Sequence, residues 1–182
     1  MIFMFIKRFM GILLAMTFFA GCMAGQIAQR RGDKAYRAND YETAAQEYSE
    51  AATSGNRDAQ YHLGAMYIEG QGVPKDLVKG ADLLRQAAEQ GQNDAQLMYG
   101  LLNIYGDGVP VDPEEGVRWL TTAANGGNDI AMYYLGTLYA MGLGVEKNIL
   151  TALQWMEKAK DSGFPVKEEL LTESGLSALY TE

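Results

Sequence analysis

The feature of this chain that could form a binding or catalytic site is a glycine-rich segment that occurs three times. "YIEGQGVPKD" occupies Tyr67–Asp76, "YGDGVPVD" occupies Tyr105–Asp112 and "YAMGLGVEKN" occupies Tyr139–Asn148. A glycine-rich loop can bind phosphate, hold a metal or turn the chain. A phosphate loop follows a strand and ends in Gly-Lys-Ser/Thr, or completes a third glycine of a dinucleotide fingerprint. No copy does either, so we interpret each loop as a corner between two helices.

Other catalytic groups are scarce. The chain has one histidine, His62, and one cysteine, Cys22, which leaves little for metal or thiol chemistry. A lone histidine on a repeat helix is more often a packing or surface residue than a general base. The sequence contains no Ser–His–acid set, HExxH helix or paired-cysteine metal spacing. We therefore predict a protein that is not an enzyme, with no catalytic residue, no metal, no cofactor and no small-molecule substrate.

Composition favours a folded protein. Of the 182 residues, 48% are hydrophobic and 21% are charged, which is typical of a globular chain. The length suits one ordinary domain or a short repeat array. The net charge of −8 and the pI near 4.7 argue against a nucleic-acid partner.

The N-terminal segment has the order of a secretory signal. Lys7 and Arg8 precede an apolar run over residues 9–20, and small residues follow it. This run is too short to span a hydrocarbon core of ~30 Å. The sequence "FAGC" resembles the bacterial lipobox, in which a small pair precedes the lipidated cysteine, although Phe19 stands where leucine is usual. The resemblance implies that residues 1–21 are a lipoprotein signal peptide and that Cys22 carries the lipid.

Two alternatives stay open for this segment. Plain cleavage after a small residue would leave Cys22 as a free thiol, and an uncleaved segment would act as an N-terminal anchor. If Cys22 is lipidated, the sorting rules of bacterial lipoproteins apply, and Met23 rather than Asp follows the cysteine. These rules imply the outer membrane of a Gram-negative bacterium, with the protein lipid-anchored and facing the periplasm.

The glycine-rich segment belongs to a repeat with a period of 36 residues. Seven columns keep this register: Ala59/Ala95/Ala131, Gly64/Gly100/Gly136, Gly70/Gly106/Gly142, Gly72/Gly108/Gly144, Val73/Val109/Val145, Ala87/Ala123/Ala159 and Gly91/Gly127/Gly163. A fixed period of this size predicts a solenoid of stacked structural units.

Each unit is predicted to contain two helices. The first helix ends at Gly70, Gly106 or Gly142, where a left-handed cap suits glycine. The second helix begins after Asp76, Asp112 or Asn148. In the middle unit we expect Pro113 to be the first helical residue and Glu115 to complete a capping box with Asp112. The bulky core position of the second helix is assigned to Leu83, Trp119 and Trp155.

The pattern A-x3-L-G-x2-Y-x2-G-x-G-V-x2-D-x3-A-x2-W-x3-A-A-x2-G resembles the Sel-one-like repeat, a relative of the tetratricopeptide repeat. This resemblance implies an all-α fold, a right-handed α-solenoid of helix-turn-helix repeats. Three repeats are assigned to residues 57–92, 93–128 and 129–163. Residues 32–56 are similar to a tetratricopeptide unit with a tight turn at Asn39–Asp40. Residues 22–31 are expected to be a tether and the start of the first helix, and residues 164–182 a capping helix, beginning at Pro165, and a tail.

The resemblance also implies binding to a partner protein, because such repeats bend into a superhelix whose first helices line a concave groove. We predict that the groove is lined by first-helix residues that the repeat core does not use. They are Tyr61, Ile68, Leu97, Leu101, Ile104, Tyr105, Tyr133 and Met141. The alternative is that several of them pack between neighbouring helices. Gln29, Asp33, Tyr36 and Arg37 would make the first unit polar and partly basic.

The leading functional hypothesis is therefore a non-catalytic interaction scaffold, anchored by lipid to the bacterial envelope, with one or more envelope or periplasmic proteins as partners. An alternative is an immunity lipoprotein that neutralises a periplasmic phospholipase-type toxin. A second alternative is a hydrolase with β-lactamase-like activity, which has been associated with cysteine-rich members of this repeat class. This chain lacks their paired cysteines.

Overall fold

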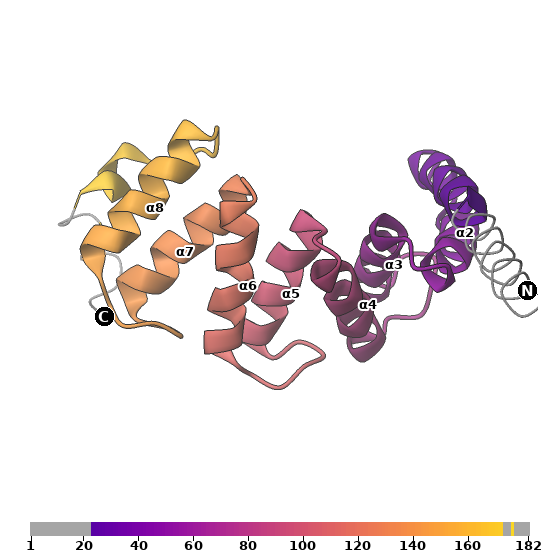
Figure 1. The fold of residues 1–182 in the computed structure, drawn as a ribbon, viewed down its shortest axis with the longest axis horizontal. Helices are drawn as coiled ribbons and strands as arrows, with labels where there is room; N and C mark the ends of the chain where they lie inside the picture. The colour runs from indigo at the N-terminus through magenta and orange to yellow at the C-terminus, as the bar shows by residue number, and fades with distance from the viewer. Residues whose placement is uncertain (1–22, 173–175, 177–182) are drawn as a thin grey trace, which may run out of the picture. The chain divides into compact units, whose positions relative to one another are not determined.

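The computed structural model describes residues 23–172 and residue 176, and the regular structure within them is helical throughout (Figure 1). Residues 23–37 form a helix. It is followed by α2 (Tyr41–Thr53), α3 (Arg57–Glu69), α4 (Leu77–Glu89), α5 (Asn93–Tyr105), α6 (Pro113–Asn125), α7 (Asp129–Met141), α8 (Ile149–Asp161) and the 3-10 helix η1 (Glu168–Leu171). The chain divides into two compact units, Met1–Lys75 and Asp76–Glu182. The prediction of an all-α fold is confirmed.

Side-chain caps set where each helix begins. In α2 to α8 the N-cap side chain accepts a hydrogen bond from the backbone N–H three residues further on, which satisfies a donor that the helix leaves unpaired. The caps are Asp40, Asn56, Asp76, Gln92, Asp112, Asn128 and Asn148. The first helix of each repeat ends at a left-handed glycine, with φ of 75° at Gly70, 79° at Gly106 and 74° at Gly142, as predicted.

The start of α6 confirms one prediction and corrects another. Asp112 is the N-cap, because its Oδ1 accepts from the Glu115 backbone N–H at 2.9 Å. The Asp112 N–H, however, donates to the Asn103 carbonyl at 2.8 Å. The Glu115 carboxylate accepts instead from Trp119 Nε1 at 2.6 Å and pairs with Arg118. The capping box expected at Glu115 is therefore wrong.

The core of the second unit also differs from the expectation by one residue. Leu84, Leu120 and Met156 are fully buried, whereas Leu83, Trp119 and Trp155 in the preceding column are only half-buried. A helix turns by about 100° per residue, so adjacent columns face different directions. The Trp119 ring lies at the edge of the core, 5.7 Å from Tyr99, where its Nε1 can reach a hydrogen-bond acceptor.

Glycines of two repeat columns, one in the first helix and one in the loop, allow close packing. A Cβ at Gly100 of α5 would lie 3.0 Å from Leu120 Cγ and 3.1 Å from the Gly116 carbonyl of α6. In the loop that follows α5, a Cβ at Gly108 would overlap the carbonyl of Leu77, the first residue of α4. Gly144 meets Pro113 in the same way. Each loop therefore turns the chain and packs against the first residue of the second helix of the preceding repeat.

In the first unit, helix 23–37 packs against α2 through small residues. A Cβ at Gly32 would lie 2.6 Å from the ring of Tyr48, which is buried. Residues 23–31 are helical, so the expected tether is part of this helix. Asn39 takes a φ of 60° and Asp40 caps α2, which agrees with the tight turn predicted there.

The C-terminal segment closes the second unit. Residues 164–167 have no regular structure, so helix begins at Glu168 rather than at Pro165. Phe164 packs against Tyr133 with ring centroids 4.7 Å apart, and Leu170 packs beside the fully buried Leu176. A repeat array needs such a cover over its exposed end.

The predicted signal segment 1–21 and Cys22 lie outside the described residues. Among the helices that the structure describes, none has the length and apolarity needed to cross a membrane.

Candidate partner-binding face

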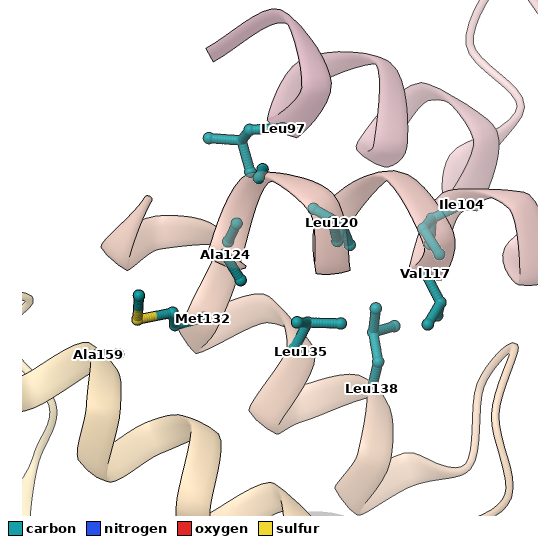
Figure 2. Packing of buried hydrophobic residues seen from close by; sticks show 11 residues of the cluster. Leu97, Ile104, Val117, Leu120, Ala124, Met132, Leu135, Leu138 and Ala159 are labelled. Atoms are coloured by element: carbon teal, nitrogen blue, oxygen red, sulfur yellow. The ribbon is translucent and has the colours of Figure 1, made fainter. Parts of the chain in front are cut away.

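Two of the residues predicted to line a groove belong to the core. Leu97 and Ile104 of α5 are each 7% exposed and pack in the same cluster as Val117 and Leu120 of α6 (Figure 2). Their side chains stabilise the contact between α5 and α6. Leu97 and Ile104 are therefore not available to a partner, and assigning them to the binding surface was wrong.

The accessible side of each first helix is displaced by one residue along the chain from the buried positions of Leu97 and Ile104. In α5 it follows Asp94, Met98, Leu101 and Tyr105, and in α7 it follows Ile130, Tyr134, Thr137 and Met141. The steps of three and four residues place each set on one side of its helix. Every member is exposed or half-buried. Because the two sets share the same repeat columns, they occupy equivalent positions on consecutive repeats.

Six large apolar side chains on these two helices form what is called here the apolar face. They are Met98, Leu101 and Tyr105 of α5, and Ile130, Tyr134 and Met141 of α7. Tyr105 is 64% exposed, Met141 43% and Ile130 40%. Leu101 and Tyr134 rest against the core cluster with part of each side chain outside it. Single exposed hydrophobic residues need no explanation, but recurrence of large apolar residues at two columns, Met98/Tyr134 and Tyr105/Met141, does.

The charge of the two helices fits an apolar contact surface. Neither α5 nor α7 contains a lysine or an arginine, and each has one aspartate in its first turn. The Asp94 carboxylate accepts a hydrogen bond from Asn128 Nδ2 at 3.2 Å, so it is already engaged at the end of the face. Methionine adapts its shape to a partner, and tyrosine combines a large apolar ring with a polar tip. This arrangement supports binding of a protein surface.

The remaining predicted residues fall into three groups. Leu101, Tyr105 and Met141 lie on the apolar face. Tyr133 is half-buried beneath Phe164, and it lines a small cleft with the C-terminal segment. In the first unit, Tyr61 and Ile68 of α3 are half-buried, and Tyr61 lies 5.0 Å from His62. A role for Tyr61, Ile68 and Tyr133 in binding stays a prediction.

Sequence reasoning missed Met98, Ile130 and Tyr134. A signal for their columns was present, because a column that holds a charged residue in one repeat faces solvent in its sisters. Asp58 and Asp94 share a column with Ile130, and Glu69 shares one with Tyr105 and Met141. His62 likewise shares a column with Met98 and Tyr134. Comparing columns for polarity would have placed the face correctly.

His62 itself is held in an aromatic stack in the first unit. Its ring lies 5.0 Å from that of Tyr48 at an interplanar angle of 19°, and the Tyr48 hydroxyl donates to Asp33 Oδ1 at 2.9 Å. Burial is the main cause that raises the Tyr48 pKa above its usual value, and the hydrogen bond to Asp33 adds to it. These contacts support the packing interpretation of His62. Within residues 23–172, no cluster of three or more His, Cys, Asp or Glu side chains could hold a metal ion.

Comparison with known proteins identifies the repeat. The Sel1 repeat model matches residues 57–92, 93–128 and 129–164. No curated protein matches the chain in sequence.

Two solved structures show the same architecture. The chain is 33% identical to a Sel1 repeat protein from Oxalobacter formigenes, with a TM-score of 0.72 over 76% of this chain and 58% of that one. It is 40% identical to c5321, a protective antigen of uropathogenic Escherichia coli strains that displays an SLR fold, with a TM-score of 0.67 over 68% of this chain and 27% of that one. The chain thus spans less than two thirds of the length of either protein. Its fold is an all-α solenoid of helix-turn-helix repeats, and the chain belongs to the Sel1-repeat family.

Proposed function

We propose that this chain is a non-catalytic scaffold that binds a partner protein through the apolar face of α5 and α7. Sel1-repeat proteins generally mediate protein–protein interaction, and their scaffold is typically non-catalytic. The apolar face extends this general role to named residues. Its partner is proposed to be an envelope or periplasmic protein.

The observation that carries the proposal is the exposure of Tyr105, Met141 and Ile130 at columns that the fold does not use. Neighbouring columns supply the buried core, and the caps and loop glycines close the helices without help from these side chains. Tyrosine and methionine are more frequent in protein interfaces than on the rest of the protein surface. A few such anchors supply most of the binding energy of an interface.

We further propose that the scaffold is attached to the outer membrane through a lipid on Cys22 and faces the periplasm. The support is the sequence "FAGC" behind a short apolar run. Two or three acyl chains give stable attachment, since each buried CH₂ contributes about 0.8 kcal/mol.

Affinity capture from native membranes tests the binding face. Tyr105→Glu with Met141→Glu should abolish recovery of the partner, because a charge buried at the centre of an interface is unpaired. The matched control is Val78→Glu with Leu150→Glu, which places the same charges at exposed apolar residues of the second helices α4 and α8. Equal recovery by both variants would contradict the proposal. A phospholipase-type toxin among the captured proteins would identify the scaffold as an immunity protein.

Membrane fractionation tests the attachment separately. Cys22→Ser should release the protein from membranes washed at high salt, because salt screens any contact held by surface charges, or leave the precursor unprocessed. A Cys22→Ser protein that fractionates with the salt-washed membranes in its normally processed form would show that the lipid site is wrong.

A further inference from the structure

The helix over residues 23–37 has two sides of different chemistry. Its inner side contains three buried small residues, Gly25, Ala28 and Gly32. A Cβ at Gly32 would lie 2.6 Å from the Tyr48 ring of α2, and one at Gly25 would overlap Ser54. The close packing fixes which side of the helix faces away from α2.

The outer side is a single stripe that combines apolar and cationic residues. It consists of Met23, Ile27, Arg30, Lys34 and Arg37, spaced by three or four residues over fifteen positions. All five are exposed, including 55% of Met23 and 52% of Ile27. At 1.5 Å per residue the stripe is roughly 21 Å long. The apolar residues stand at its N-terminal end, and the three cations follow them.

The cations of this stripe stand out in an acidic chain. Residues 30–37 contain Arg30, Arg31, Lys34 and Arg37, although the net charge of the whole protein is −8. Arg31 lies off the stripe and pairs with Glu47 and Glu50 of α2 at 2.7 and 3.3 Å. In the part of the chain that the structure describes, Arg30, Lys34 and Arg37 form no ion pair. Their charges are therefore available to another molecule.

Asp33, the one acidic residue of helix 23–37, forms hydrogen bonds with Tyr48 and Gln29. It accepts these hydrogen bonds at 2.9 Å and 3.2 Å, respectively. Its charge is therefore held at the inner side of the helix, against α2.

We propose that this stripe lies on the surface of a bilayer that contains anionic phospholipid. Met23 and Ile27 enter the boundary between headgroups and acyl chains, and Arg30, Lys34 and Arg37 bind headgroup phosphates. Helices with basic and apolar residues bind membranes in this way, and each cation near an anionic surface strengthens the attachment. A free phosphate would use the cations but leave Met23 and Ile27 without a function. An acidic protein would explain the charges, but not the order of apolar residues and then cations along the helix.

The position of the stripe in the chain agrees with this occupant. Met23 directly follows Cys22, the predicted lipid-attachment residue, so a lipid there would hold the apolar end of the stripe at the bilayer. A basic patch beside an acyl chain is a common second attachment signal. The contact deepens the proposed membrane attachment and rests on it in part, but it does not depend on the apolar face of α5 and α7.

An environment-sensitive fluorophore at position 27 tests the contact. The full chain carrying Cys22→Ser and Ile27→Cys is labelled and reconstituted into vesicles of phosphatidylcholine, with or without phosphatidylglycerol. We expect a blue shift of the emission only when phosphatidylglycerol is present, and its loss at high salt, because ions screen surface charges. A label at Val78→Cys, on α4 of the second unit, should stay in water in both vesicles.

Charge variants separate the stripe from the net charge. Arg30→Gln with Lys34→Gln and Arg37→Gln should abolish the blue shift, whereas Lys75→Gln with Lys147→Gln and Lys167→Gln should keep it. All six residues are exposed, so helical circular dichroism should be unchanged in both variants.

Four results would overturn the proposal: no shift in either vesicle, an equal shift without phosphatidylglycerol, an equal loss in both charge variants, or a shift that requires an added acidic protein instead of lipid. The last result would assign the stripe to a protein partner. The apolar face of α5 and α7 is intact in every variant, so partner capture still tests the proposed function by itself.

Discussion

The first helices α3 and α5 share their framework and differ on their accessible sides. Both have an alanine in the first turn, a buried glycine in the middle of the helix and a left-handed glycine at the C-cap. The accessible columns hold Asp58, His62, Ala65 and Glu69 in α3, but Asp94, Met98, Leu101 and Tyr105 in α5. The framework columns repeat because the same packing recurs every 36 residues. The accessible columns differ between the two repeats, and we propose that they carry the difference in function.

This difference supports the proposal that the binding surface lies in the second unit. The accessible columns of α3 contain two acids, one at each end, with His62 held in an aromatic stack between them. Those of α5 contain one acid and three large apolar residues, one of which is 64% exposed. Apolar anchors of this kind supply binding energy when a partner buries them. If the comparison is correct, substitutions in framework columns should change stability, and substitutions in accessible columns should change binding.

The largest loss of stability is expected from Gly108→Val. Gly108 has a φ of +77°, and any Cβ would overlap the Leu77 carbonyl, so backbone would have to move. Gly127→Val is the matched control, since Gly127 has a φ of +90° but nothing within 4 Å of a Cβ. The control should cost roughly 1–2 kcal/mol for its left-handed conformation alone. Thermal and urea unfolding measure both, and equal losses would show that the loop does not pack on α4 as described.

A large loss is also expected from Leu120→Ala, at about 2–5 kcal/mol, because Leu120 is fully buried and its removal leaves a cavity. Leu101→Ala makes the same chemical change on the accessible side of α5 and should cost less, since Leu101 is only half-buried. Urea unfolding of the two variants compares a framework column with an accessible one. A cost at Leu101 equal to that at Leu120 would assign Leu101 to the core.

A smaller and pH-dependent effect is expected at Tyr48 in the first unit. Burial, and then the hydrogen bond to Asp33, raise the Tyr48 pKa above the usual value of 10.0. The unfolded state therefore loses this proton more readily, so the free energy of unfolding should fall as the pH rises above 10, by at most about 1.4 kcal/mol per pH unit. Tyr48→Phe should remove this component of the pH dependence. The measurement is urea unfolding of both proteins below and above pH 10, and identical slopes would contradict the assignment.

The framework could be predicted from the sequence because its causes are local. Gly70, Gly106 and Gly142 end helices by their own conformational freedom, and Asp76, Asp112 and Asn148 cap the next helices with their own side chains. Residues within one turn of each position decide these features.

The direction in which each side chain points was harder to predict. Two of the predictions were displaced by one residue along the helix. Leu97 was predicted to be accessible, but the accessible residue is its neighbour Met98. Trp119 was predicted to be the core residue, but the fully buried residue is its neighbour Leu120. In both cases adjacent columns are occupied by large apolar side chains, so hydrophobicity alone does not separate directions that differ by about 100°. The contacts that separate them, such as Leu120 against Gly100, join residues far apart in the sequence.

The most direct test of the account compares two adjacent residues of α5, Leu97→Glu and Met98→Glu. Each variant is melted by circular dichroism and used for affinity capture from native membranes. Leu97→Glu should lower the melting temperature strongly, because it buries an unpaired charge in the core. Met98→Glu should melt within a few degrees of the parent protein, as expected of a surface substitution, and lose its partner. A Met98→Glu protein that unfolds like Leu97→Glu, or that keeps its partner in full, would contradict the separation of framework and binding face.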